Sequence, residues 1–396
     1  MAQPVWEVAD ILRRHGDAYR AQHALPAYQL RMMRALQLCR TATLGGHIER
    51  CGHCDHQRIS YNSCRNRHCP KCQNLARAQW IEARKAELLP IAYFHVVFTI
   101  PEQLNPLALQ NKKVFYDLLF ATTAATLQTI ARDPKHLGAE IGFFSILHTW
   151  GQALTHHPHI HSVVTGGGLR PDHTGWVRGR QRFFLSVGVL SCLFRRLFLE
   201  ALYQSFQQKR LSFHGALTPL AQPHAFGALL APLGKCKWVV HAKRPFGGPR
   251  QVIDYLGRYT HRVAISNHRL RNVEGGQVTF QYKQYRAALG QQDREMTVTA
   301  EEFIRRFLLH SLPPGFQRIR HYGLFASRTK EENLALCRHY LNMPAGPLPA
   351  PDPDLTAHQK LLAPLLLCPQ CRTGTLVRVL FLPAATGPPP HRAVTS

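Results

Sequence analysis

One short stretch decides the fold expected for this chain: residues 157–165, with the sequence His-Pro-His-Ile-His-Ser-Val-Val-Thr. Its β-branched end, followed by three glycines at 166–168, predicts a strand that stops in a turn. Successive side chains of a strand point to opposite faces, so His159 and His161 share one face while Ile160 is buried on the other. Two imidazoles on one face of a strand can bind one divalent ion.

The histidine pair does not complete a metal site. Histidine occurs 24 times in the chain, and a pair taken alone fits a core or a surface equally well. A third ligand is needed for a stable site that keeps positions open to a substrate, and its candidates are His148, Gln152, His156 and His157. Oxygen ligands from a substrate favour Mg²⁺ or Mn²⁺ as the working ion, although imidazoles also accept Zn²⁺.

Two tyrosines form the second notable feature. Tyr255 and Tyr259 lie one helical turn apart in residues 249–260, a segment that we expect to be helical. Arg258 and Arg262 place positive charge beside the phenols, which favours a phenolate and attracts a phosphodiester in DNA. Tyrosines on helices usually pack in a core, so this pair is not diagnostic by itself. Combined with a metal site, it is what a nuclease needs to cut DNA through a covalent phosphotyrosine.

The net charge indicates the same kind of partner. Lys and Arg total 49 against 23 Asp and Glu, a formal charge of +26. Such a charge destabilises a compact state unless a polyanion neutralises it, so nucleic acid is the first partner expected. An anionic membrane is the alternative, but the charges are spread along the whole chain. No apolar run approaches the roughly 18 residues of a membrane span, and no signal peptide is evident, so we expect a cytoplasmic protein.

Cysteines are concentrated near the N-terminus, where six of the eleven lie between Cys39 and Cys72. In a reducing compartment such clustering favours metal binding over disulfides. The pairs Cys51-x2-Cys54 and Cys69-x2-Cys72 are 14 residues apart, the spacing of a zinc ribbon. We therefore expect these four thiolates to hold one structural zinc ion. Two residues inside the loop are alternatives for one ligand, namely Cys64 and His68.

Two further sets of residues accompany the zinc module. A third pair, Cys368-x2-Cys371, has the spacing of half a zinc site, and the nearest candidates to complete it are Cys337 and His339. Cations also decorate the module and are consistent with contacts to DNA, although a solvated face is the simpler alternative: Arg58, Arg65, Arg67 and Lys71.

Composition divides the chain into three parts. Residues 1–90 contain two helices and the zinc module, and residues 343–396 form a proline-rich linker and tail. Residues 91–342 alternate apolar strands with helices. The strands are expected at 92–100, 141–150, 157–165, 238–242, 263–265 and 278–282. The helices are expected at 105–132, 187–210, 249–260 and 301–310.

Three strings resemble, in order, the rolling-circle insertion-sequence transposases of the IS91 and ISCR-like group: residues 61–72, 157–161 and 255–266. The resemblance runs from about residue 30 to about residue 340 and includes residues 245–249. It implies an α+β fold in which a small helical and zinc-ribbon-like domain precedes an HUH endonuclease-like antiparallel sheet flanked by helices. It also implies that His159 and His161 hold the catalytic metal ion, and that Tyr255 and Tyr259 are the nucleophiles.

The function implied by the resemblance is cleavage and transfer of single-stranded DNA ends, in a bacterial cytoplasm and at the nucleoid. A replication initiator or relaxase would use the same chemistry and is the nearest alternative. A zinc-dependent DNA-binding regulator without catalysis explains the cysteines and the charge but leaves the histidine and tyrosine pairs to chance. A carboxylate-based transposase lacks an evident cluster of acidic residues.

Overall fold

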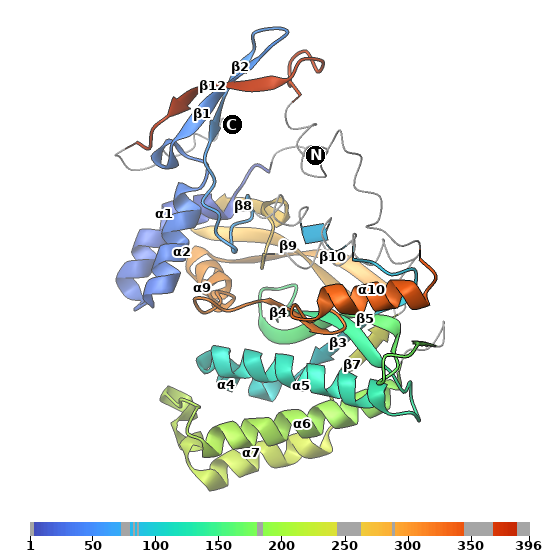
Figure 1. Ribbon diagram of the computed structural model, residues 1–396. Coiled ribbons are helices and arrows are strands. Elements are labelled where there is room, and N and C mark those ends of the chain that lie inside the picture. Colours follow the sequence, from blue (N-terminus) through green and yellow to red (C-terminus); the bar gives the residue numbers. More distant parts are fainter. Residues whose placement is uncertain are drawn as a thin grey trace.

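The computed structural model describes residues 4–72, 80–81, 84, 87–179, 185–243, 263–286, 290–343 and 367–385. Over these residues it has the α+β architecture expected from the sequence, with antiparallel sheets packed against helices (Figure 1). The largest sheet has six strands. Five follow in the order β11 (Ile319–Gly323), β4 (Glu140–Trp150), β5 (His156–Leu169), β3 (Tyr93–Thr99) and β7 (Val240–Lys243), and β6 (Trp176–Arg178) pairs with β5.

The strand that carries the histidines is central in this sheet. β5 pairs with β4 on one side and with β3 on the other, so that His161 lies opposite Ile146 and Val97. The aromatic and β-branched sequence of β3 suits this position, because such side chains pack well on a sheet that is covered on both faces. The strands expected at 92–100, 141–150 and 157–165 are confirmed.

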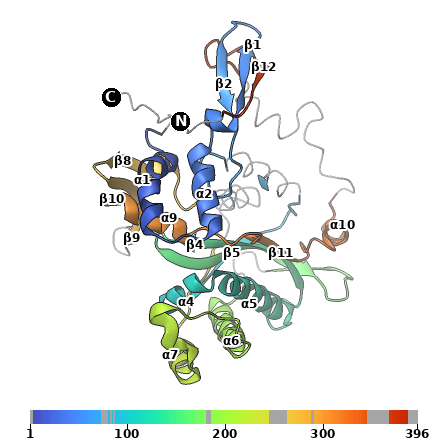
Figure 2. The ribbon, with the colours of Figure 1, turned by 90° about the vertical axis from the view of Figure 1, so that its left-hand side faces the viewer.

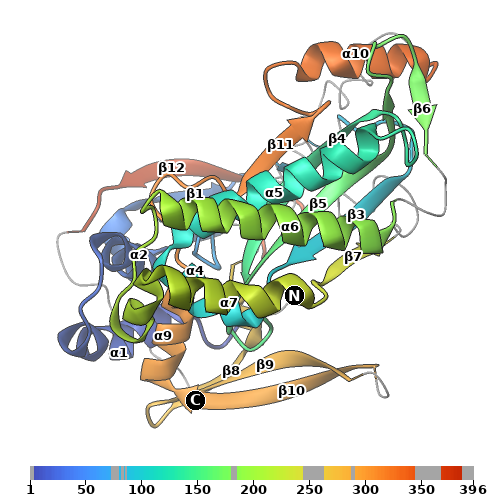
Figure 3. The ribbon, with the colours of Figure 1, turned by 90° about the horizontal axis from the view of Figure 1, so that it is seen from below.

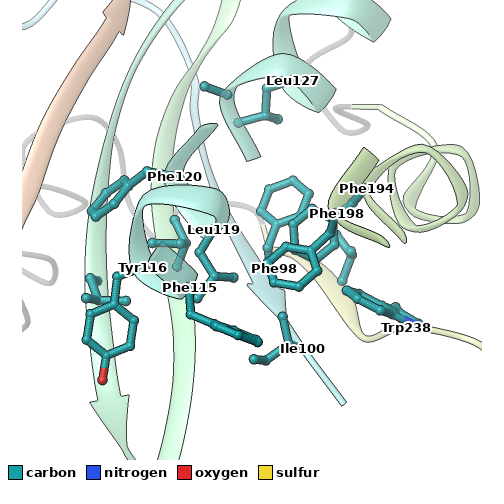
Figure 4. Close-up of a cluster of buried hydrophobic side chains, with 14 of the residues drawn as sticks. Phe98, Ile100, Phe115, Tyr116, Leu119, Phe120, Leu127, Phe194, Phe198 and Trp238 are labelled. Carbon is teal, nitrogen blue, oxygen red and sulfur yellow. The ribbon is translucent and has the colours of Figure 1, made fainter. Parts of the chain in front are cut away.

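Helices cover one face of the large sheet (Figure 3). They are α4 (Asn105–Gln110), α5 (Lys112–Arg132), α6 (Val187–Gln207) and α7 (Pro223–Lys235). Alternate residues of the strands, among them Phe98 and Ile160, pack with aromatic residues of α5 and α6 in the main core (Figure 4). This alternation leaves the neighbouring histidines on the opposite face.

The expected helix at 105–132 is interrupted at Asn111, which ends α4 and precedes α5. The Asn111 side chain instead bonds to the backbone of Ser212, a neighbour far along the chain. By length and composition α5 meets the criteria for a membrane span, although no such segment was expected from the sequence. Most of this helix is buried inside the protein. A core helix satisfies the same criteria, and α5 has that role here.

A second layer lies on the other face of the large sheet (Figures 1 and 2). It consists of three helices, α1 (Val8–Gln22), α2 (Ala27–Leu38) and α9 (Ala300–Leu309), and a three-stranded sheet, β8 (Leu270–Glu274), β9 (Gln277–Arg286) and β10 (Gly290–Thr299). Its own apolar core contains Ile11, Met33 and Phe303. Helix α10 (Lys330–Tyr340) packs beside Phe144 of the large sheet.

The third sheet joins an N-terminal hairpin to a strand from the C-terminal part of the chain. Its order is β12 (Leu376–Leu382), β1 (Gly46–Cys51) and β2 (Gln57–Tyr61), and it projects from the body beyond α1 and α2 (Figure 1). β12 falls in the part that we expected to be a tail, yet it pairs antiparallel with β1 over six residue pairs. Beyond Met343, the expected linker at 343–354 lies outside the described residues, and the division into three domains stays a prediction.

Short 3-10 helices connect these elements: η1 (Ala42–Leu44), η2 (Glu102–Leu104), η3 (Gly215–Ala221) and η4 (Asn267–Arg269). The expected helix at 249–260 lies outside the described residues. The expected strand at 263–265 is wrong, since these buried residues form a bend before η4.

The glycine triplet is not a turn after β5, because the strand continues through it to Leu169 and pairs with β6. A Cβ atom at Gly168 would lie 2.1 Å from the Glu140 carbonyl oxygen, and one at Gly167 would lie 2.5 Å from that of Val177. The triplet is therefore explained by the close approach of neighbouring backbones.

Candidate functional site

Three imidazoles gather on the face of the large sheet that α4–α7 do not cover. His148 on β4 lies directly opposite His159 on β5, and His161 follows on the same face. One ring nitrogen of each lies within 4.8 Å of the others. The ring centroid of His148 lies 5.6 Å from that of His159 and 4.5 Å from that of His161. The strand register thus brings one of the four candidate ligands, His148, to the expected pair.

The other candidates are placed differently. His156 shares a 3.0 Å hydrogen bond between its Nε2 and the Tyr116 hydroxyl of α5, on the helix-covered side. His156 and His157 are not part of the three-histidine group. Gln152 lies in the turn between β4 and β5, where its backbone carbonyl accepts a hydrogen bond from Arg269. Nothing in the sequence favoured one of these candidates, because residue spacing does not show which strands pair or in which register.

Two ring contacts determine which nitrogens face the centre of the group. His159 Nδ1 donates to the carbonyl oxygen of His157 at 2.7 Å, which leaves Nε2 as the unprotonated nitrogen. His161 Nδ1 lies 2.7 Å from Nε2 of His95 on β3, with the two rings stacked at 5.0 Å. Metal-binding imidazoles commonly use their second nitrogen in such contacts, which fix the ring orientation.

His95 is a residue of this site that was not expected from the sequence. The expected strand at 92–100 was available, and strand alternation places His95 on one face with Val97, opposite Phe94 and Phe98. The sequence does not show that β3 pairs with β5, and this pairing brings His95 to His161. A histidine in an otherwise apolar, buried strand is the signal that would have identified it.

Burial favours the neutral form of His159. Loss of solvation lowers the pKa of His159 to about 4, although its hydrogen bond to the His157 carbonyl acts in the opposite direction. Neutral imidazole is the form that binds a metal ion. The described residues add no carboxylate to this group. Three imidazole nitrogens fit a divalent ion whose remaining positions are taken by oxygen atoms of a substrate.

The predicted nucleophiles Tyr255 and Tyr259 lie outside the described residues, and so do Arg258 and Arg262. The ends of that segment are described. At one end, β7 is an edge strand of the large sheet, beside β3. At the other, Arg269 donates to the carbonyl of Gln152, in the turn between β4 and β5, at 2.5 Å. Both ends are therefore attached to the sheet that carries the histidines.

Eight cysteines form two groups of four, each with all sulfur atoms within 4.8 Å of one another. The first, here called the helix cysteine group, contains Cys39, Cys64, Cys69 and Cys72. The second, the hairpin cysteine group, contains Cys51, Cys54, Cys368 and Cys371.

The expected single site of Cys51, Cys54, Cys69 and Cys72 is therefore wrong, because its two pairs belong to different groups. Cys51 ends β1 and meets the segment that leads into β12, whereas Cys69 and Cys72 lie against Cys39 at the end of α2. Cys337, a candidate partner of Cys368, lies on α10 instead, buried in the cluster that packs this helix against the large sheet. The ribbon spacing was misleading because zinc ligands can come from any segment that the fold brings near.

The structure also distinguishes the two alternative zinc ligands. Cys64 belongs to the helix cysteine group, with its sulfur 3.6 Å from that of Cys72. His68 does not, and its Nε2 instead accepts a hydrogen bond from the backbone N–H of Leu312 at 3.4 Å. Burial lowers the pKa of His68 to about 3, assisted by the charge of Arg318. His68 thus acts as a buried acceptor that joins the cysteine-rich module to the body.

Several cations expected to face DNA are engaged within the protein. Arg67 is half-buried and donates to the Phe316 carbonyl at 2.5 Å. Lys71 forms an ion pair with Glu7 at 2.5 Å, and Arg58 forms one with Glu49 at 2.6 Å. Arg65 is exposed. Arg67 and Lys71 therefore hold the module against the rest of the protein, Arg58 pairs within the β1–β2 hairpin, and Arg65 faces solvent.

Comparison with known proteins assigns a family to this architecture. Residues 11–100 match the family described as "Transposase zinc-binding domain", and residues 142–333, which include the three histidines, match "Putative transposase". The chain is 55% identical over 395 residues to "Putative transposase y4qJ" of Sinorhizobium fredii (strain NBRC 101917 / NGR234), covering 98% of each chain. The chain belongs to the IS91-like transposases.

A second relative of this transposase is more distant. The transposase is 30% identical over 321 residues to "Transposase for insertion sequence element IS801" of Pseudomonas savastanoi pv. phaseolicola, covering 80% of the chain and 74% of the relative. No solved structure matches it. Membership of the family makes DNA its partner and implies DNA endonuclease and strand-transfer activity.

The zinc-binding match bears on the cysteine groups of the transposase. It contains all four members of the helix cysteine group but only two members of the hairpin cysteine group. The match and the two groups support structural zinc. Cys368 and Cys371 lie outside both matched ranges.

Proposed function

We propose that the transposase cleaves and transfers single-stranded DNA ends through a 5′-phosphotyrosine intermediate during rolling-circle-type transposition. The observation that supports this proposal is the group of His148, His159 and His161 on two neighbouring interior strands, β4 and β5, of an antiparallel sheet. A group of three imidazoles leaves room for oxygen atoms of a phosphodiester on the same ion. The proposed partners are the single-stranded ends of the element and its target site, on nucleoid DNA in a bacterial cytoplasm.

His148, His159 and His161 would hold the catalytic Mg²⁺ or Mn²⁺ ion. Such an ion, when bound, stabilises negative charge that develops on the non-bridging oxygens of the scissile phosphate. His95 orients His161, and the His157 carbonyl orients His159, so that the nitrogens are directed before DNA binds. Burial keeps the His159 ring neutral, as its lowered pKa indicates.

The proposed nucleophiles are Tyr255 and Tyr259. The phenol oxygen of one attacks the scissile phosphorus, a bond from phosphorus to tyrosine forms, and the bond to the 3′ oxygen breaks. The phenol loses its proton and the released strand gains one at its 3′-OH. The phosphodiester energy is kept in the covalent link, so transfer to a target strand needs no ATP. A second tyrosine allows a second cleavage before the first adduct is resolved.

Two sets of residues would support this chemistry without taking part in it. Cys39, Cys64, Cys69 and Cys72 would hold the zinc ion of the N-terminal domain, with four protein ligands and no position for water, as in structural sites. The exposed Arg65 of that domain, together with Arg258 and Arg262 beside the tyrosines, would contact the DNA backbone.

The test uses the full-length protein, single-stranded DNA from an end of its element, and Mg²⁺ or Mn²⁺. The DNA carries one label on each side of the cleavage site, and denaturing gels separate free DNA from protein–DNA adduct. We expect the wild type to form an adduct with the strand 3′ of the break, and Tyr255→Phe/Tyr259→Phe to form none. Tyr203→Phe, an exposed tyrosine on α6, is the matched control and keeps the adduct.

The outcomes separate the alternatives. Loss of adduct in His159→Ala, with zinc content and DNA binding unchanged, supports the catalytic role of the histidine group. An adduct that persists in the double tyrosine variant contradicts the assigned nucleophiles. Binding of DNA by a wild type that never cleaves it, with either metal ion, would favour the non-catalytic regulator instead.

A further inference from the structure

We infer that the transposase holds a second zinc ion between its N-terminal hairpin and its C-terminal segment, with the hairpin cysteine group as the complete ligand set. Cys51 and Cys54 come from the β1–β2 hairpin, and Cys368 and Cys371 precede β12. The sulfur of Cys51 lies 3.7 Å from that of Cys371, and the sulfur of Cys54 lies 3.5 Å from that of Cys368. Four converging sulfur atoms are the ligand set of a closed, tetrahedral zinc site.

The backbone around these sulfurs suits thiolates. The N–H of His53 donates to the sulfur of Cys51 at 3.4 Å, and the N–H of Gly374 donates to that of Cys371 at 3.3 Å. One sulfur of each Cys-x2-Cys pair therefore accepts a hydrogen bond from the backbone, from within the turn at Cys51 and from three residues beyond it at Cys371. Such donors favour the charged form of an acceptor, which is the form that binds zinc.

Gly374 provides a steric observation that adds to the distances between the sulfurs. A Cβ atom at this position would lie 2.4 Å from the sulfur of Cys51 and 2.7 Å from the Cβ of His53. Any larger residue would displace a ligand, so the C-terminal turn can approach the hairpin this closely only with glycine. A Cβ atom added at Gly52, in the facing turn, would have no atom of a non-adjacent residue within 4 Å.

The packing of this sheet indicates why an ion is needed. The apolar cluster around the site consists of Cys51, Cys368 and Leu376, with two more cysteines at its margin. Most of the apolar side chains of β12 are exposed, including Leu380 and Phe381. So small a core cannot hold a separate segment in place, whereas zinc binding supplies folding energy directly in domains of this size.

The site also explains the pairing of distant segments. β12 and β1 are separated in sequence by the whole sheet that carries the histidine group, and the ladder between them begins with the pair Cys51 and Leu376. Bringing the two ends together costs chain entropy that grows with the length of the closed loop. A shared zinc ion offsets that cost, because both halves of its ligand set must be in place.

The first experiment counts zinc ions in the purified full-length protein. All variants carry His159→Ala, so that zinc bound at the histidine group does not contribute. We expect two zinc equivalents per chain in this background, and one after adding Cys368→Ser/Cys371→Ser. Adding Cys64→Ser/Cys69→Ser should also leave one, and Cys192→Ser/Cys236→Ser, which exchanges exposed cysteines outside both groups, should leave two. A count of one without cysteine changes, or of two after Cys368→Ser/Cys371→Ser, would overturn the inference.

A second pair of variants leaves every cysteine in place. Titration with Co²⁺ gives a sulfur-to-metal absorption band that rises with each four-thiolate site. We expect Gly374→Ala to lose about half of this band and Gly52→Ala to retain it. Equal bands in the two variants would contradict the steric argument.

Alkylation during zinc removal tests the ligand set in the wild type. As a chelator removes zinc, Cys51, Cys54, Cys368 and Cys371 should become reactive together, as mass spectrometry of peptides can show. Free reaction of Cys368 and Cys371 while Cys51 and Cys54 stay protected would also overturn the site. None of these readouts depends on DNA cleavage, so their failure is distinct from a failure of the proposed function.

Discussion

The three histidines of the proposed catalytic site are held in three different ways. His159 is fixed by a carbonyl of its own strand, and His161 by His95 on the neighbouring strand. The ring of His148 stacks on Trp150 at 4.9 Å, with the planes 17° apart. Each ring is thus oriented by a separate neighbour. Exchanging one neighbour should therefore change the orientation of one ring and leave the other two rings in place.

This separation gives a prediction at the scale of single residues. We expect His148→Ala to weaken Mn²⁺ binding strongly, because it removes one of three nitrogens. His95→Leu should weaken it by roughly 10- to 100-fold, as is typical when a residue that orients a metal-binding histidine is lost. Isothermal titration with Mn²⁺ measures both changes.

His157→Ala is the matched control for this prediction, since His157 contributes its backbone carbonyl to His159 and its ring is not part of the group. Its Mn²⁺ affinity should stay close to that of the wild type. A loss in His157→Ala as large as in His148→Ala would contradict the assignment of His148 as the third ligand. An unchanged affinity in His95→Leu would show that His95 does not position His161.

At the scale of elements, strand register decides where the chemistry lies. Ile160 is fully buried against α5 and α6, and its two neighbours on β5 face the other way. A shift of β5 by one residue would place the histidines in the helix-covered core and Ile160 at the metal site. The register changes immediately beyond His148, where an irregularity precedes the pair of Trp150 with His156.

Helix α9 offers a prediction at this scale. The Thr299 hydroxyl caps the helix by accepting a hydrogen bond from the N–H of Glu302 at 3.1 Å. Thr299→Ala should lower the free energy of unfolding by about 1 kcal/mol, within a range of about 0.5–2 kcal/mol for such caps. Urea unfolding of the full-length protein measures the change.

Ser186 is the matched control, because it precedes α6 at the same position but its side chain makes no capping hydrogen bond. Ser186→Ala should change the free energy of unfolding by less than about 0.5 kcal/mol. Equal effects of the two substitutions would show that the Thr299 cap does not stabilise α9.

At the scale of the whole molecule, the large sheet separates two layers with different roles (Figures 1 and 2). One layer, α4–α7, supplies the main apolar core. The other adjoins the histidine face, and the cysteine-rich region is attached on that side through Arg67 and Lys71. The proposed zinc ions and the proposed catalytic ion therefore belong to the same side of the sheet.

The buried histidines make the stability of the whole protein depend on pH. His310 is buried between Thr149 and Leu154, and loss of solvation lowers its pKa to about 3, well below the value of about 6.5 expected in the unfolded chain. The unfolded chain therefore binds a proton that the folded protein does not. This contribution to stability is present in full above about pH 6.5 and is lost as pH falls toward 3.

We expect the free energy of unfolding to decrease between pH 7 and pH 5, with His310 contributing at most about 1.4 kcal/mol per pH unit. Urea unfolding at several pH values measures the slope. His310→Gln should give a shallower slope, with a reduction that corresponds to at most one proton bound on unfolding. A slope as steep as that of the wild type would show that His310 does not contribute.

Much of the candidate site follows from the sequence alone. Strand alternation determines that His159 and His161 share a face and that Ile160 opposes them, because side-chain direction is a property of the extended backbone. The charge of +26 indicates a polyanionic partner whatever the fold. The thiol-rich segment indicates zinc, because two cysteines separated by two residues direct their sulfurs to one point.

The tertiary structure decided which distant residues meet. His148 joins the pair because of the register between β4 and β5, and His95 meets His161 because β3 lies on the other side. Cys51 meets Cys371 because β12 returns to β1. Local periodicity follows from covalent geometry and is visible in the sequence. The partners of a residue depend instead on the path of the whole chain, so the cysteine pairs that looked like one site belong to two.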